Sequence, residues 1–204
     1  MKLSPTLLFA LLVPFTAACS SKPEAQASAP ASAAPTPPAP AAAPAAAATG
    51  ALAFTAQPGW VVEKPTSAMR KAQYTLPHVE KDTEDAALVV YFFSGQGGDL
   101  QANLDRWCGQ FEQPDGKPST EVLKNSSRTV NGMNVHQADL SGTYVAETAP
   151  GSGEHVRKEG WRMLAAILEA MEGPYYAKLV GPAATVAKWE ESFKSFVDAA
   201  KPGS

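Results

Sequence analysis

The amino-acid sequence predicts an α+β fold, an antiparallel β-sheet flanked by helices in a layered sandwich. Three observations support this prediction: several short runs have strand character, an Asn-Gly pair at 131–132 separates two of them, and two segments carry an apolar helical stripe. Asn-Gly tolerates positive φ at both turn positions, which suits a type I′ hairpin and makes the sheet at least partly antiparallel. Amphipathic helices bury their apolar face against such a sheet.

The first strands are expected near residue 52. Residues 52–56 alternate apolar and polar side chains, a Pro-Gly pair at 58–59 predicts a turn, and a short strand resumes at Trp60. Residues 71–76 form another short strand-like run. Pro77 ends it, because proline cannot donate a ladder hydrogen bond.

The segment AALVVYFF, residues 86–93, is apolar on both faces of a strand. One face carries Ala87, Val89, Tyr91 and Phe93, and the intervening residues make an apolar second face. A strand of this kind lies in the interior of a sheet with both sides covered.

Two segments predict amphipathic helices. The apolar stripes have helical spacing, and Glu190 and Lys194 form a supporting i,i+4 pair in the second. The first stripe consists of Leu100, Leu104, Trp107, Cys108 and Phe111, and the second of Val186, Trp189, Phe193, Phe196, Val197 and Ala200.

The glycine-rich turn SGQGG, residues 94–98, has the outline of a phosphate-binding loop. A Walker loop needs a lysine and a hydroxyl residue after its last glycine, whereas Asp99 and Leu100 follow here. Leu100 also stands where a dinucleotide loop has its third glycine. Asp99 suits the helix N-cap, where its carboxylate accepts the free N–H groups. We interpret the turn as structural and expect no nucleotide.

The segment WRMLAAILEAMEG, residues 161–173, is ambiguous. Its alanines, leucines, methionine and glutamates favour a helix by local propensity. The strand-like run at 172–181 follows at once, however, and Glu172-Gly173 suits a hairpin turn between two strands. Propensity alone leaves both alternatives open.

Residues 1–18 have the features of a secretory signal peptide: a basic start at Lys2, an apolar run over 7–15 and small residues after it. The apolar run is far shorter than the roughly 20 residues of a membrane-spanning helix.

The sequence TAAC, which ends at Cys19, resembles the lipobox of bacterial lipoproteins, although Thr16 stands where leucine is usual. The resemblance implies that Cys19 receives lipid and becomes the new N-terminus. Ser20 after it implies the outer membrane, with the protein facing the periplasm. Ordinary signal cleavage nearby is the alternative.

Residues 19–50 are expected to form a Pro/Ala-rich disordered tether. Beyond Cys19 they contain no aromatic and no large aliphatic residue, so they cannot bury enough apolar surface to offset ordering entropy. The remaining segment, 51–204, has the length of one globular domain.

Charge and cysteine content narrow the function classes. Loss of Lys2 from the 17 basic side chains leaves 16 against 20 acidic ones, a net charge of −4. Without a basic run, nucleic acid is not an expected partner. Of the two cysteines, Cys19 is assigned to lipid, and Cys108 lies on an apolar stripe and is expected to be buried.

No residue pattern predicts a catalytic, metal or cofactor site. His78, His136 and His155 lack metal-ligand spacing, and GSGEH at 151–155 places a serine near a histidine without an orienting acid. The carboxylates at 82–85 lack a calcium-loop register.

Several motifs occur together in chain order. They are PGW, MRKAQYTLP, GGDLQANLDRWCGQF, GTY and GPYYAKLVGP, followed by a final helix. The sequence resembles an uncharacterised family of bacterial lipoproteins that is similar to the PsbP-like superfamily, over nearly all of residues 52–197. The resemblance implies an antiparallel sheet between helices (an α/β/α sandwich) and favours a strand over 161–172. Members of the superfamily bind large partners rather than catalyse reactions, and none of their functional residues can be placed here.

These observations lead to the expectation of a lipid-anchored, non-catalytic binding or accessory module with a protein partner in the cell envelope. Two alternatives stay open. An envelope hydrolase would need a deep pocket that joins one of the histidines to a carboxylate. A small-ligand carrier would have an apolar cavity lined by Tyr91, Tyr175 or Tyr176.

Overall fold

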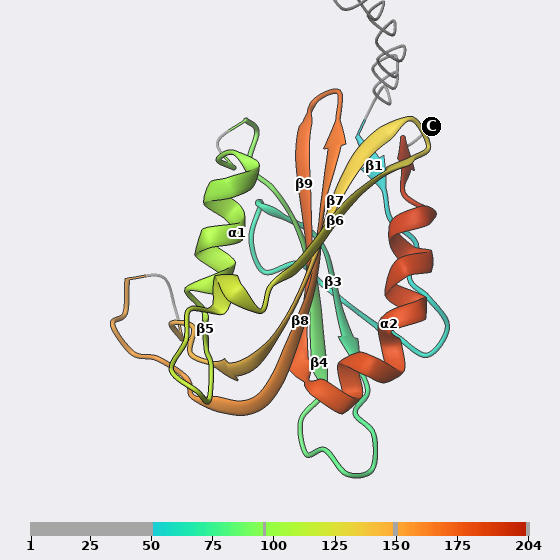
Figure 1. Cartoon of the computed structure of the whole chain (residues 1–204). Coiled ribbons are helices and arrows are strands. Elements are labelled where there is room, and N and C mark those ends of the chain that lie inside the picture. The colour runs from blue at the N-terminus through green and yellow to red at the C-terminus, as the bar shows by residue number, and fades with distance from the viewer. Residues whose placement is uncertain (1–50, 96, 149–150, 203–204) are drawn as a thin grey trace, which may run out of the picture. The chain divides into compact units, whose positions relative to one another are not determined.

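The computed structural model describes residues 51–95, 97–148 and 151–202 (Figure 1). In this part of the chain the main sheet has eight strands in the order β2-β3-β4-β9-β8-β7-β5, and β6 also pairs with β7. Every pairing in it is antiparallel. The strands are β1 (Leu52–Ala53), β2 (Val61–Glu63), β3 (Arg70–Leu76), β4 (Ala86–Phe92), β5 (Phe111–Glu112), β6 (Lys124–Val130), β7 (Met133–Tyr144), β8 (Lys158–Ala170), β9 (Gly173–Pro182) and β10 (Lys201–Pro202), and the helices are α1 (Leu100–Cys108), η1 (Ser119–Glu121) and α2 (Ala183–Asp198).

The α+β class is therefore confirmed, with the sheet as the dominant element. β1 and β10 pair with each other in a separate two-stranded sheet, so the predicted first strand is shorter than 52–56 and lies outside the main sheet. The turn at 58–59 and the strands that follow it are present.

β4 lies between β3 and β9, as its two-sided apolar pattern predicted. Leu88 and Val90 are fully buried on one face, and Tyr91 packs on the other. β4 can be apolar on both faces because each face packs against one of the two apolar clusters.

The ambiguous segment is a strand, so the prediction for 161–172 is confirmed. β8 pairs with β7 on one side and with β9 on the other, and the β8–β9 hairpin turns at Met171-Glu172 before Gly173 opens the next strand. Pairing along both edges outweighs a helix propensity of a few tenths of a kcal/mol per residue.

The β6–β7 hairpin turns at Asn131-Gly132, with φ of 48° and 81°, and Val130 and Met133 close it as a pair. Positive φ at both positions is the signature of the type I′ turn that the sequence predicted.

The two helices pack against different apolar clusters and lie on opposite sides of the sheet in Figure 1. α2 contributes Val186, Phe193, Phe196 and Val197 to one cluster. α1 contributes Leu104, Trp107 and Cys108 to the other.

The first helix is shorter than its apolar stripe, and this part of the prediction is wrong. α1 ends at Cys108, and Gly109 caps it by donating its N–H to Asp105 O. Phe111 is buried, as expected, but from β5, where it pairs with Tyr144. The strand continues the stripe because both elements face the same cluster.

Candidate functional site

A recess lies beneath α1 on its side of the sheet, with a volume of about 180 Å³. Strands β4 and β9 form its floor, and α1 and the residues after it form its wall. The lining residues are Tyr91, Phe93, Arg106, Trp107, Gln110, Tyr176 and Lys178.

Aromatic rings make up most of this lining. Tyr91 and Phe93 lie on the same face of the chain as it leaves β4, and their rings stack with centroids 5.8 Å apart and planes 6° from parallel. Tyr176 pairs with Tyr91 across the β4–β9 ladder, and its ring lies 5.6 Å from that of Phe93. The period of two along the strands brings these rings together.

Lys178 is the only charged residue of β9 and lies in the middle of the sheet, between β4 and β8. Its Nζ donates to Gln110 Oε1 and lies 5.5 Å from the centroid of the Tyr144 ring. Burial, with the nearby charge of Arg106, lowers the pKa of Lys178 to about 8.

No carboxylate of the described residues forms an ion pair with Lys178 or with Arg106. The recess therefore presents two cations without a countercharge. Reasoning from the sequence missed both residues. The available signal was a lysine at 178 inside an otherwise apolar strand, YYAKLVGP.

Asn103, only 1% exposed, connects the glycine-rich turn to Arg106. Its Nδ2 donates to Gly97 O and to Asp99 O, at 2.8 Å each, and its Oδ1 accepts from Arg106. The turn thus fixes the helix that carries Arg106. A polar residue beside the apolar stripe of α1 was the sequence signal for this role.

Asp99, at the end of the glycine-rich turn, is the N-cap of α1, as the sequence predicted. Asp99 Oδ1 accepts from Ala102 N at 2.8 Å. Gly97 has a separate purpose, because a Cβ there would lie 2.1 Å from Tyr176 Oη. That hydroxyl donates to Gly98 O at 3.3 Å, so the turn packs against Tyr176, one of the residues that line the recess.

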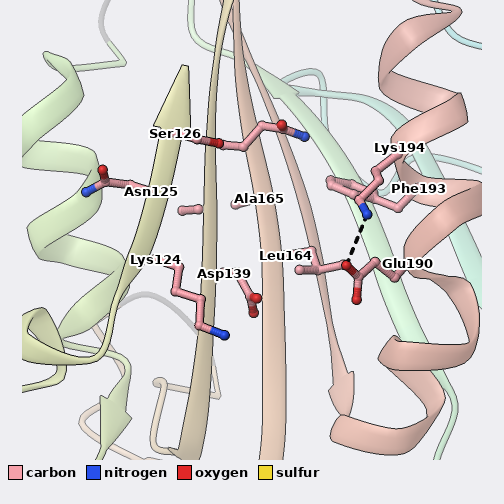
Figure 2. A pocket seen from close by; sticks show the side chains of 11 residues that line it. Lys124, Asn125, Ser126, Asp139, Leu164, Ala165, Glu190, Phe193 and Lys194 are labelled. Carbon is pink, nitrogen blue, oxygen red and sulfur yellow. Dashed lines mark ion pairs between the residues drawn. The ribbon is translucent and has the colours of Figure 1, made fainter. Parts of the chain in front are cut away.

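A second hollow, of about 250 Å³, lies between α2 and strands β6, β7 and β8 (Figure 2). Three of its four charged lining residues, Asp139, Glu190 and Lys194, form ion pairs. Arg162 beside it donates to both carboxylate oxygens of Asp139 (2.8 and 2.9 Å) and also pairs with Glu190, which in turn pairs with Lys194 at 3.2 Å. This network ties α2 to the sheet, while Lys124, which also lines the hollow, forms no ion pair with another described residue.

His136 contacts both a hydroxyl and a carboxylate. Its Nδ1 lies 2.7 Å from Ser127 Oγ, and its Nε2 lies 3.1 Å from Glu169 Oε1. The three residues come from adjacent strands on an exposed part of the sheet, and none of them lines a described pocket.

The carboxylates at 82–85 have separate partners. Asp82 accepts from the backbone N and the hydroxyl of Thr185, and so caps the first turn of α2. The other two pair elsewhere: Asp85 lies 2.6 Å from His78 Nδ1, and Glu84 binds Lys158 at 2.7 Å.

The remaining predicted candidates are separated. His155 Nδ1 contacts Val145 O, whereas Ser152 Oγ contacts Thr148 and Glu154, so the serine and histidine of GSGEH share no hydrogen bond. Cys108 is buried and free, and burial raises the pKa of its thiol. Cys19 and the tether lie outside the described residues.

Among residues 51–95, 97–148 and 151–202, no three His, Cys, Asp or Glu side chains gather as metal ligands. No helix of this part of the chain has the length and apolar character to cross a bilayer.

Comparison with known proteins gives no family. No known protein family and no curated protein matches the chain. The solved structures include a weak structural neighbour, the protein of unknown function PA94 from Pseudomonas aeruginosa, described as a candidate regulator. It has 12% sequence identity and a TM-score of 0.44 over 71% of this chain and 98% of its own.

Proposed function

We propose that the protein is a lipid-anchored, non-catalytic binding module of the cell envelope that holds a small ligand in the recess beneath α1. The observation that carries this proposal is the pair of cations, Lys178 and Arg106, that face an aromatic recess without a carboxylate partner. Lys178 is the desolvated member of the pair and Arg106 is exposed, so the cost of a charge without a countercharge falls on Lys178, and a bound anion removes that cost.

The envelope location remains part of the proposal. It is supported by the lipobox-like TAAC at Cys19, by the signal-like residues 1–18 and by the tether over 19–50. We propose attachment at the outer membrane, facing the periplasm, through a lipid on Cys19.

We further propose that the layered arrangement is the PsbP-like one. The packing of α1 and α2 against different apolar clusters supports it. Because PsbP-like proteins bind large partners, we also propose that an envelope protein binds this protein when its recess holds the ligand.

Native mass spectrometry of the full chain, extracted from the bacterial envelope in mild detergent, tests the binding function. We expect wild type and the control Lys194→Met to carry a small-molecule adduct that is released on unfolding. Lys178→Met should carry none. Absence of an adduct from all three proteins would rule the proposal out.

A hydrolase is the second candidate, because Ser127, His136 and Glu169 lie in hydrogen-bond contact as a nucleophile, base and orienting acid would. A fluorophosphonate probe would label the Ser127 hydroxyl if the histidine activates it. Labelling that Ser127→Ala abolishes and Ser126→Ala retains would favour the hydrolase over the binding module.

A further inference from the structure

We infer that the ligand of the recess is a small aromatic carboxylate, a single planar ring that bears one carboxylate group. This inference rests on the proposed binding function and deepens it. Three properties of the recess determine the class: its charge, its ring faces and its size.

The charge requires an anion. Lys178 lies in the floor and Arg106 at the exposed rim, and the two cations repel each other while no carboxylate of the described chain lies between them. A carboxylate between them accepts hydrogen bonds from both and supplies the missing countercharge. A neutral ligand leaves the repulsion in place, and a cation increases it.

The aromatic side chains of the floor favour a ring. Three aromatic rings line the recess. The ring centroid of Phe93 lies 5.8 Å from that of Tyr91 and 5.6 Å from that of Tyr176, a spacing typical of favourable ring packing. A planar ring beside them extends the same stack. Strongly hydrated anions such as phosphate would lose water against these apolar rings without a matching gain.

The volume limits the ligand to one ring. About 180 Å³ corresponds to roughly six waters at liquid density. This is below the usual range of drug-sized pockets, which starts at about 300 Å³. A single ring therefore matches the size of the recess, and fused rings or long acyl chains would extend beyond it.

Titration calorimetry on the detergent-solubilised full chain tests the inference with four probes: benzoate, cyclohexanecarboxylate, benzamide and inorganic phosphate. We expect benzoate to bind at least tenfold more tightly than each of the others. Lys178→Met should weaken benzoate binding at least tenfold, and Lys194→Met should leave it unchanged.

Arg106→Gln provides a second variant, because Arg106 is exposed and glutamine keeps an amide donor for Asn103 Oδ1 while it removes the charge, and it should weaken benzoate binding several-fold. Benzoate affinity of the wild type should also fall above about pH 8, as Lys178 loses its proton, and stay flat in Lys178→Met. The other titratable groups that face Lys178 are Arg106 from α1, Tyr91 from β4 and Tyr144 from β7.

Each contrary result has its own meaning. Equal binding of cyclohexanecarboxylate and benzoate overturns the requirement for a ring, and tighter binding of benzamide overturns the requirement for charge. Preference for phosphate overturns the ligand class while the binding function stands. If no probe binds and the native protein carries no adduct, the proposed function fails as well.

Discussion

Lys178 is a charged side chain on an interior strand of the sheet, where an apolar residue would stabilise the fold more. Its amine has one amide partner, Gln110, and one aromatic face, that of Tyr144. A residue that lowers the stability of the ligand-free protein is typical of binding sites, where stability and function compete.

Replacement of Lys178 by methionine should therefore raise the free energy of unfolding at pH 7, by about 1–3 kcal/mol. The folded-state pKa of about 8 lies below the ordinary 10.5. Between these values the unfolded chain binds more protons, so wild-type stability rises with pH across this window. Urea unfolding of both proteins should show a difference that is largest below pH 8 and shrinks toward pH 10.5. A variant less stable than wild type at pH 7 would contradict this account.

Gly97 is required by close approach rather than by a positive φ. In Gly97→Ala the new Cβ would lie 2.1 Å from Tyr176 Oη, so the turn or the tyrosine must move. We expect a loss of about 1–3 kcal/mol in stability, measured by urea unfolding. Gly109→Ala is the matched control, since its Cβ would meet its nearest atoms at 3.5 and 3.6 Å, and it should change little.

Among the elements, β8 shows how pairing overrides propensity. Its core, MLAAILEA, consists of good helix formers, yet both of its edges are paired and most of its side chains are buried. A helix here would leave β7 and β9 without a common neighbour, so the ladder hydrogen bonds of three strands favour the sheet.

α2 is held to the sheet by its apolar face and by Arg162. Methionine at 162 would leave the partly buried carboxylate of Asp139 without its bidentate partner. We expect Arg162→Met to lower the free energy of unfolding by about 1–3 kcal/mol. The exposed Lys194→Met should cost at most about 1 kcal/mol. Equal effects of the two variants in urea titration would show that the Arg162 pairs contribute no more than surface ones.

For the whole molecule, the two faces of the sheet have different roles. The α2 face combines a core with the second hollow, where Lys194 pairs with Glu190, whereas the α1 face combines a core with the recess, where Lys178 and Arg106 have no carboxylate partner among the described residues.

Phase separation in a non-ionic detergent checks the anchor. We expect the wild-type protein in the detergent phase and Cys19→Ala in the aqueous phase, because acyl chains contribute about 0.8 kcal/mol per buried CH₂. Mass spectrometry of the mature N-terminus supplies the control. An unmodified thiol at Cys19 in the envelope-purified protein would refute lipidation.

By itself, the sequence determined the features that depend on neighbours along the chain. These include the Asn131-Gly132 turn, the N-cap at Asp99, the two-sided strand at β4 and the apolar face of α2. Each follows from local φ preferences or from periodicity, which tertiary contacts did not overturn.

Only the tertiary structure decided the rest. β8 is a strand because of partners on both sides, and Phe111 belongs to β5 because Tyr144 lies opposite. The recess joins Tyr91, Arg106 and Lys178 from three separate elements, and no spacing along the chain encodes that meeting. Whether a cation has a carboxylate neighbour depends on the residues around it in space, so only the tertiary structure shows it.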